Sequence, residues 1–284
     1  MSASSSVRHL CLTIAYDGTD YVGWQVQPNG VSVQSRVERA IEKLTGESIR
    51  IMAAGRTDSG VHALGQTVSF QTRSRIPVEN FRQGLQTHLP DDIVIRVVRE
   101  TADDFHATYS ATKKQYRYVI YNGRAPHPFA RRYSYHYHGP LDVAAMHAAA
   151  RIVVGTHDFR CFESHFPNKA SSVRTVTRAQ VRRQSGWNTW QASRFSGTES
   201  AAWTHGNTGD TTAGGDFIWF DIEADGFLYN MVRAIAGTLL KIGRGFWQPD
   251  DMQRIIDSQD RSQAGETAPP QGLYLVRVDY GTQL

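Results

Sequence analysis

Cysteine is nearly missing from this chain, which has only Cys11 and Cys161, far apart and with no second thiol beside either. Two isolated thiols are typical of buried, reduced side chains and argue against a secreted disulfide framework. No apolar run approaches the roughly 20 residues that a membrane helix needs, and the start, MSASSSVRHL, lacks the apolar core of a signal peptide. We therefore expect a cytoplasmic protein that has no membrane partner.

Metal and nucleotide motifs are also missing. None of the histidines stands at metal-ligand spacing from a cysteine or glutamate, so we expect no metal site. The Gly243-Arg244-Gly245 run is typical of the end of a helix and not of a phosphate-binding loop. We accordingly expect no cofactor.

Acidic residues are absent between Ala111 and Gly139, although the net charge of the whole chain is only +4. That stretch carries these basic residues and tyrosines: Lys113, Lys114, Arg117, Arg124, Arg131, Arg132, Tyr116, Tyr118, Tyr121, Tyr133, Tyr135 and Tyr137. Cations that pair with phosphates, interleaved with rings that stack on bases, are what an RNA-binding surface needs. A tyrosine-rich β-hairpin with a solvated basic face is the alternative interpretation.

The length of 284 residues suits two domains of ordinary size. We expect an N-terminal domain over residues 7–107 and a C-terminal domain over 111–282. Residues 184–215, rich in Ser, Gly, Thr and Asn, interrupt the second domain as a long loop or extended hairpin.

Over the first hundred residues, hydrophobic periodicity predicts the order β-α-β-β-α-β. The expected strands are His9–Tyr16, Ile49–Ala53, Thr67–Thr72 and Ile93–Val97. Ser32 caps a helix that Gly46 ends, and Pro77 opens a second helix. This is a ferredoxin-like pattern, in which both helices cover one face of the sheet.

The second half repeats the theme with longer connections. The expected strands are Gln115–Tyr121, a hairpin partner at Tyr133–His138, Val173–Arg183, Asp216–Glu223 and Leu273–Tyr280, and the expected helices begin at Leu141, Phe227 and Pro249. One face of the 173–183 strand carries Arg174, Arg178 and Arg182, and we take Arg174 as a candidate RNA contact. The predicted fold class is therefore α+β, with two ferredoxin-like βαββαβ halves around a central cleft.

The strongest candidates for catalytic side chains lie in the run GRTDSGVHALGQ at residues 55–66. Glycines on both sides of an Arg-Thr-Asp core let the backbone approach a ligand while Arg56 and Asp58 are presented together. An ordinary Asx-turn would use the same Asp and Gly. Asp-Ser-Gly is also typical of aspartic proteases, but those need two carboxylates sharing a proton, and this chain has one such motif. His62 is better suited to orienting the loop than to holding a metal.

These motifs resemble the tRNA pseudouridine synthase A family, which modifies the anticodon stem-loop. Besides GRTDSGVHALGQ, four stretches match in the same order: YDGTDYVGWQ from Tyr16, DDFHATYSATKKQYRYVIYN from Asp103, GFLYNMVRAIAGTLLKIGRG from Gly226 and GLYLVRVDY from Gly272. Together they span nearly the whole chain. Ser59 stands where the family usually has Ala, and the 184–215 segment is longer than the turn of compact members.

The resemblance implies a role for each matching residue. Asp58 would be the catalytic nucleophile, Tyr116 would stack on the target uracil, and Arg233 would pair with the catalytic Asp. Arg56 would fill the gap left by the flipped base. Independently of the resemblance, the basic stretch leads us to expect that Lys113 and Lys114 contact phosphates. The resemblance further implies a homodimer that acts on tRNA uridines 38, 39 and 40. A non-catalytic RNA-binding protein on the same fold is the alternative.

Those roles agree with elementary chemistry. The reaction breaks the N1–C1′ bond, rotates the uracil and forms a C5–C1′ bond, so no water is consumed. One carboxylate, attacking at C1′ or at C6, is sufficient as nucleophile. A glycosidase needs a second carboxyl to protonate its leaving group, whereas here the uracil is retained and recaptured. The target base must leave its stack, and aromatic and Arg contacts offset that cost.

Overall fold

The structure, a computed structural model, describes residues 7–164, 171–184 and 215–283. The insertion expected at 184–215 therefore lies, apart from its two end residues, outside the described part. The chain divides into two compact units, one formed by Met1–Lys114 with Tyr274–Leu284 and the other by Gln115–Leu273. The C-terminal segment, which we expected in the second domain, groups with the first unit.

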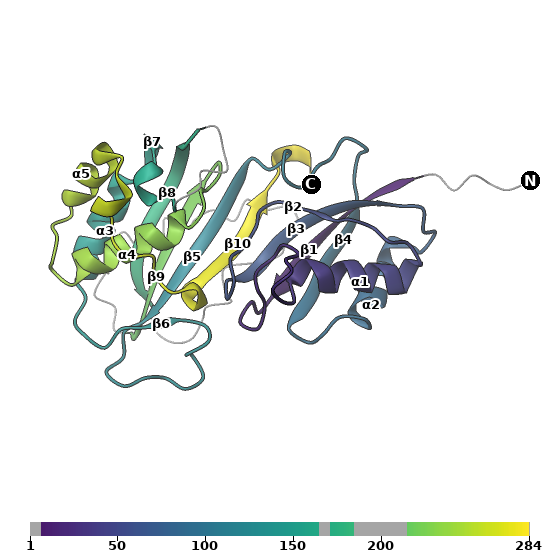
Figure 1. The fold of residues 1–284 in the computed structure, drawn as a ribbon, viewed down its shortest axis with the longest axis horizontal. Coiled ribbons are helices and arrows are strands. Elements are labelled where there is room, and N and C mark those ends of the chain that lie inside the picture. The colour runs from purple at the N-terminus through teal and green to yellow at the C-terminus, as the bar shows by residue number, and fades with distance from the viewer. Residues whose placement is uncertain (1–6, 165–170, 185–214, 284) are drawn as a thin grey trace, which may run out of the picture. The chain divides into compact units, whose positions relative to one another are not determined.

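The first unit holds the elements β1 (Arg8–Tyr16), α1 (Val33–Thr45), β2 (Met52–Ala53), β3 (His62–Thr72), α2 (Val78–Gln86), β4 (Ile93–Glu100) and β10 (Leu273–Asp279) (Figure 1). Its strands lie in the order β4-β1-β3-β10, and β2 pairs with β3 as well. β1 is antiparallel to β3 and β4, and β10 is parallel to β3. The order β-α-β-β-α-β is the one that periodicity predicts.

Helix α1 begins and ends where its capping residues predict. The Ser32 hydroxyl accepts a hydrogen bond from the N–H of Ser35, and Gly46 at φ +75° closes the C-terminus by donating to the carbonyl of Glu42. Its apolar stripe is buried, as are Leu10, Leu12 and Ile14 on one side of β1. Figure 1 shows α1 and α2 on the same side of this sheet, so the main core lies between them and the strands.

The opposite face of this sheet has a smaller core made of Cys11, Ala54, Phe105 and Tyr280. Both cysteines of the chain are free and buried, as predicted. Burial raises the pKa of each thiol to about 12, so both remain protonated near neutral pH.

The second unit holds β5 (Lys113–Tyr121), β6 (Tyr135–His136), α3 (Val143–Ile152), β7 (Gly155–Asp158), β8 (Val173–Gln184), β9 (Phe217–Ala224), α4 (Met231–Gly243) and α5 (Asp251–Ser258). Short 3₁₀ turns lie at Arg160–Phe162, Arg261–Gln263, Pro270–Gly272 and Gly281–Gln283, the last of them in the first unit. The strands lie in the order β5-β9-β8-β7, with β6 beside β5, and α3 contacts β8, α4 and α5. The fold class is α+β, as predicted.

Three elements of this unit differ from the expectation. β6 runs parallel to β5, so it is not the hairpin partner that we expected. α4 begins at Met231 and not at Phe227, because Asn230 takes the left-handed conformation at φ +61° and no helix continues through it. β7 was not expected, since four mostly polar residues show no strand periodicity.

A bulge in β8 changes which arginines share a face. Val176 pairs with Ala224, but Arg178 pairs with Glu223, so β8 has one extra residue between them. Such an insertion turns the following side chains to the other face. Arg174 is buried while Arg178 is exposed, and the prediction that Arg174, Arg178 and Arg182 share one face is wrong.

The core of the second unit contains a buried ion pair. Arg117 donates from Nε and Nη2 to the two carboxylate oxygens of Asp221 at 2.7 and 3.1 Å, and both side chains are only 1% exposed. The guanidinium also lies 3.7 Å from the ring centre of Trp219. Arg117, one of the basic residues of the 111–139 stretch, is therefore a structural residue here and not a surface cation.

Among the residues that the structure describes, no helix has the length and apolar character needed to cross a membrane.

Candidate active site

Asp58 lies in a tight turn between β2 and β3. The N–H of Val61 donates to the carbonyl of Asp58 at 3.1 Å, and Gly60 occupies the left-handed region at φ +76°. Glycine adopts that conformation without the steric penalty of a Cβ. Asp58 is half-buried and Arg56 is exposed. The loop therefore holds the Asp58 carboxylate close to the protein, while the Arg56 guanidinium reaches solvent.

Thr57 anchors the upstream end of this turn. Its Oγ1 lies 2.8 Å from the hydroxyl of Tyr16, and its carbonyl accepts from the N–H of Trp24 at 3.0 Å. Burial raises the pKa of Tyr16, so its hydroxyl stays protonated and available as a donor. The YDGTDYVGWQ stretch thus holds Thr57, the residue directly before Asp58, by hydrogen bonds.

Two glycines of that same stretch allow the backbones to meet. A Cβ on Gly23 would come within 2.7 Å of the Thr57 carbonyl oxygen, and one on Gly18 within 1.9 Å of the Val61 carbonyl oxygen. Gly23 also has φ +107°. Any other residue at either position would displace the Asp58 turn, which explains why glycine is needed here.

Further hydrogen bonds fix the rest of the loop. Ser59 donates from Oγ to the carbonyl of Tyr21 at 3.1 Å, and Gln66 donates from Nε2 to the carbonyl of Gly55 at 2.7 Å. The serine found where the family usually has alanine therefore adds a bond to the same supporting segment.

The structure brings Lys114 to this loop. Its Nζ donates to the carbonyl of Ala54 at 2.6 Å, while Lys113 beside it is exposed. Lys114 therefore supports the loop in addition to carrying charge. Within the first unit, Arg56, Asp58 and Lys114 belong to one neighbourhood.

Tyr116, Arg174 and Arg233 belong to the second unit, and all three lie near the segment GFLYNMVR at 226–233. The ring of Tyr116 meets that of Phe227 edge-on, with centroids 5.0 Å apart and planes at 80°. Tyr116 is only 7% exposed. Its ring is thus held by packing and does not rotate freely.

Arg233 is fixed by both ends of its guanidinium. Nε donates to the carbonyl of Ala268 at 2.8 Å and Nη1 donates to Oδ1 of Asn230 at 2.9 Å. Asn230 in turn donates from Nδ2 to the hydroxyl of Ser164 at 2.8 Å. Its amide serves Arg233, and it makes no side-chain cap for α4.

Arg174 lies against Gly226, whose Cβ, if present, would be 3.6 Å from the Cδ and Nε of the arginine. Its Nη1 donates to the backbone carbonyls of Ser171 and Val173, and its Nη2 is buried and has no hydrogen-bond partner among the residues that the structure describes. This placement gives the side chain a role in local packing.

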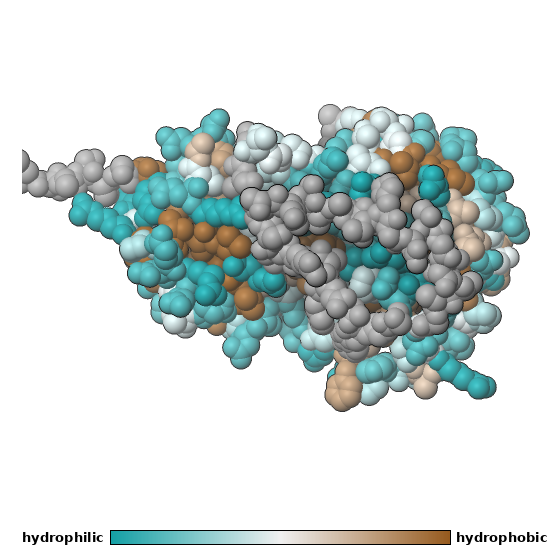
Figure 2. Space-filling view, turned by 180° about the vertical axis from the view of Figure 1, so that it is seen from behind, coloured by the Kyte–Doolittle hydropathy of each residue, from teal (hydrophilic) through white to brown (hydrophobic). Residues whose placement is uncertain are grey.

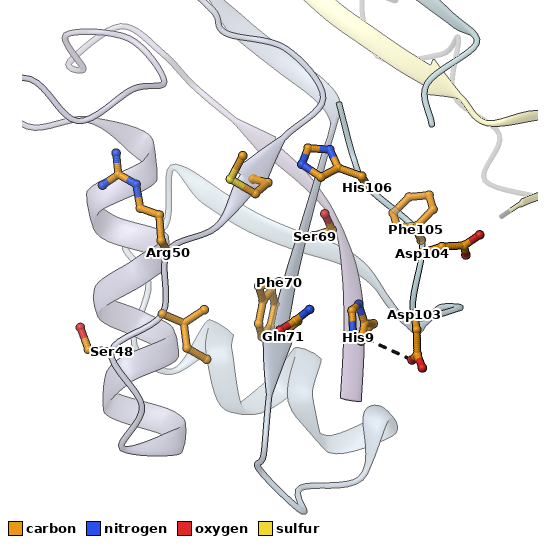
Figure 3. Close-up of a pocket in the computed structure, with 12 residues that line it drawn as sticks. His9, Ser48, Arg50, Ser69, Phe70, Gln71, Asp103, Asp104, Phe105 and His106 are labelled. Atoms are coloured by element: carbon orange, nitrogen blue, oxygen red, sulfur yellow. Dashed lines mark ion pairs between the residues drawn. The ribbon is translucent and has the colours of Figure 1, made fainter. Parts of the chain in front are cut away.

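A separate pocket of about 480 Å³ lies in the first unit (Figure 3). Its lining includes Arg50, His106 and an ion pair in which Nε2 of His9 lies 3.9 Å from the carboxylate of Asp103. None of the predicted site residues lines it. Among the described residues, no three His, Cys, Asp or Glu side chains are grouped so that they could hold a metal ion.

The surface mixes polar areas with isolated apolar ones, as Figure 2 shows for one face. Exposed rings include Tyr109, Phe129 and Phe246, with Arg244 lying 4.6 Å from the ring centre of Phe246. In the basic stretch, Arg124, Phe129 and Arg131 are each exposed. The six tyrosines of that stretch are buried or half-buried, so its exposed cations are not interleaved with exposed tyrosines as the RNA-binding interpretation expected.

Comparison with known proteins decides the family. A family model described as tRNA pseudouridine synthase matches residues 12–110 and 149–281, ranges that include Asp58, Arg174 and Arg233. The chain belongs to the tRNA pseudouridine synthase family. The tRNA pseudouridine synthase A of Moorella thermoacetica is 46% identical over 273 residues, covering 95% of this chain and 99% of that protein. Its counterpart in Acetivibrio thermocellus is 43% identical, and that in Thermoanaerobacter pseudethanolicus is 40% identical, each over 96% of this chain and the whole of the relative.

The sequence motifs of the synthase family could be identified, but the support that the YDGTDYVGWQ stretch gives to the GRTDSGVHALGQ loop could not be predicted. Tyr16, Gly18, Gly23 and Trp24 belong to a stretch that matches the family, but the match does not predict that they hold the Asp58 turn. The signal was that two glycines and three aromatic residues fall within the ten residues from Tyr16 to Gln25. Without the partner segment, that spacing does not reveal what it contacts.

Proposed function

We propose that this protein isomerises uridine to pseudouridine at positions 38, 39 and 40 in the anticodon stem-loop of tRNA, with Asp58 as the nucleophile. Membership of the synthase family supports the reaction. The observation that carries the assignment of Asp58 is the turn at 58–61, which is held by the segment from Tyr16 to Trp24 and presents one carboxylate in a fixed backbone setting.

The proposed reaction needs no partner molecule besides the RNA. The Asp58 carboxylate adds to C1′ or to C6 of the target nucleotide, and the N1–C1′ bond breaks. After the uracil rotates, C5 bonds to C1′ and the carboxylate leaves. The proton on C5 is lost to a base or to solvent, and N1 gains one, so the product is an isomer of the substrate.

Other side chains have supporting roles in this proposal. Tyr116 stacks on the uracil, Arg233 keeps Asp58 ionised, and Arg56 fills the space left by the flipped base. Lys113 and Lys114 contact phosphates. For Arg174 the burial of the guanidinium and its bonds to backbone carbonyls favour a packing role over a phosphate contact.

We further propose that the protein acts as a homodimer, as the family resemblance implies, and that it works in the cytoplasm, as its two isolated cysteines suggest. Sedimentation of the purified protein would test the dimer directly. A monomer at micromolar concentration that is fully active would contradict it.

Release of tritium from tRNA labelled at C5 of uridine tests the function. Formation of the C5–C1′ bond expels this hydrogen, so the enzyme should release label from labelled, unmodified tRNA and should leave the mass of unlabelled tRNA unchanged. Transcripts with cytidine at positions 38, 39 and 40 are the matched control and should release none. Tight binding of tRNA without any release would favour the non-catalytic RNA-binding protein.

A further inference from the structure

The turn that carries Asp58 ends at His62, the first residue of β3. His62 is 2% exposed and follows Val61, whose N–H closes the turn on the Asp58 carbonyl. The backbone between Asp58 and His62 is therefore restricted at two points, by the turn hydrogen bond and by the burial of His62. A shift of the His62 ring moves the end of the turn and, through it, the direction of the carboxylate.

The His62 ring is held on two sides. Its Nδ1 lies 3.1 Å from the backbone N of Gly18 and 3.1 Å from Oδ1 of Asp17. One of its faces stacks on Tyr274, with centroids 4.8 Å apart and planes at 25°. Asp17 is itself fixed, because its Oδ1 accepts from both the N–H and the hydroxyl of Thr19.

Nδ1 has one lone pair or one proton, so it either accepts from the N–H of Gly18 or donates to the Asp17 carboxylate. Both bonds join β3 to the 17–18 segment. An apolar side chain at position 62 would fill the space but would leave a buried N–H and a carboxylate without this partner. The chemistry of the contact, and not only its volume, therefore matters.

We propose that His62 is a positioning residue for the reaction: through Nδ1 it fixes the 17–18 segment against the downstream end of the Asp58 turn. This rests on the proposed function, in which Asp58 is the nucleophile. Thr57 fixes the upstream end through Tyr16 and Trp24, so the carboxylate is set from both sides. Misplacing a reacting group by about 1 Å can cost on the order of 100-fold in rate.

Two substitutions that have the same shape as each other, Asn and Leu, separate hydrogen bonding from packing. In His62→Asn the Oδ1 occupies the place of Nδ1 and can accept from Gly18, whereas His62→Leu has the same branching and no polar atom. We expect the single-turnover rate on tRNA to fall about 100-fold in the Leu variant and by less than tenfold in the Asn variant, with the tRNA Kd within a few fold in both. Equal rates for Asn and Leu, or a wild-type rate for Leu, would overturn the proposal.

Because an apolar residue beside Asp17 could prevent folding, His62→Gln is the second test. Glutamine is polar and close to histidine in size, but its amide lies one bond farther out and misses the Nδ1 position. The Gln variant should therefore resemble Leu and not Asn in rate. A Gln variant as active as Asn would also contradict the positioning role.

Amide hydrogen exchange tests the same idea without turnover. In the Leu or Gln variant the amides of Gly18 and Val61 should exchange at least tenfold faster than in wild type, while those of α1 should not change. Unchanged exchange at both amides would overturn the proposal. Wild type and Asp58→Asn are assayed in parallel: an inactive wild type, or an active Asp58→Asn, would count against the proposed function and leave the exchange result to decide the role of His62.

Discussion

Two hydrogen bonds join Arg233 and Ala268. The guanidinium Nε donates to the carbonyl of Ala268 at 2.8 Å, and the N–H of Ala268 donates back to the carbonyl of Arg233 at 3.0 Å. With the third bond, from Nη1 to Asn230, the planar head group is held in one orientation. This geometry depends on the shape of the guanidinium as well as on its charge.

Arg233→Lys should therefore lose most activity although it keeps the charge. Lysine has no Nε, so it cannot bond to both Ala268 and Asn230 from the same position. We expect kcat to fall roughly 10- to 100-fold, in the range for loss of a positioned charge-assisted bond. Arg244→Lys, the same exchange at an exposed residue that follows α4, is the control and should stay within about twofold. A near-normal rate for Arg233→Lys would reduce Arg233 to a structural role.

Asp58→Asn should abolish turnover while leaving tRNA affinity within a few fold. The amide is nearly isosteric but is not a nucleophile, so the reaction stops before the N1–C1′ bond breaks. Tritium release and a filter-binding measurement on the same preparation give the two quantities. If the variant kept a tenth of the wild-type rate, Asp58 would have to be removed from the mechanism.

Tyr116 should show a split between its two replacements. Phe keeps the ring that packs edge-on against Phe227, so tRNA binding should stay normal, whereas Ala removes the stacking surface and should be inactive. The comparison of Kd for wild type, Phe and Ala is the measurement. Similar binding by Phe and Ala would show that stacking is the wrong account of this residue.

Much of the fold could be predicted because local signals agree with tertiary packing. Ser32 and Gly46 mark the ends of α1, and the alternation Leu10, Leu12, Ile14 places β1 with one side in the core. The differences arise where a backbone conformation overrides the pattern. Asn230 at φ +61° delays α4, and the bulge in β8 places Arg178 and Arg182, which follow it, on the other face from Arg174.

The candidate site was predictable in its residue types and not in its support. Motif matches pointed to Asp58, Tyr116 and Arg233 because chemistry fixes those side chains. The contacts of Tyr16 with Thr57 and of His62 with Asp17 join residues about forty positions apart, and no local periodicity encodes them. Lys114 was predicted for its charge, and its bond to Ala54 depends on where β5 begins.

Replacing Lys113 by Ala should lower the salt dependence of tRNA binding. Each phosphate that a cation neutralises contributes about 0.7–0.9 to the slope of log affinity against log salt. Lys113 is exposed, so its loss should flatten the slope by about that amount without affecting stability. Lys43→Ala, at an exposed position in the last turn of α1, makes the same charge change as a control. An unchanged slope in the Lys113 variant would show that the phosphates of the RNA do not contact Lys113.

The segment between β8 and β9 should be replaceable by a two-residue Asn-Gly turn with retention of folding and catalysis. Gln184 pairs with Phe217, and Arg183 donates from Nη1 to the carbonyl of Gly215 at 3.1 Å, so the two strand ends already lie beside each other. An Asn-Gly turn matches the twist of antiparallel strands. Closure entropy grows only with the logarithm of loop length, so the shortened chain should be as stable as the full one or slightly more stable.

The reason to test the segment is its tryptophans, Trp187, Trp190 and Trp203, which could stack on RNA or on a second copy of the chain. Thermal stability, oligomer size and turnover on tRNA are measured for the shortened protein and for a full-length control with all three tryptophans changed to Ser. We expect all three quantities to match wild type in both. Loss of the dimer in both proteins, or a large rise in KM at unchanged kcat in both, would show that the tryptophans form an interaction element. The full-length control makes this conclusion possible, because it retains the backbone that the shortened protein lacks.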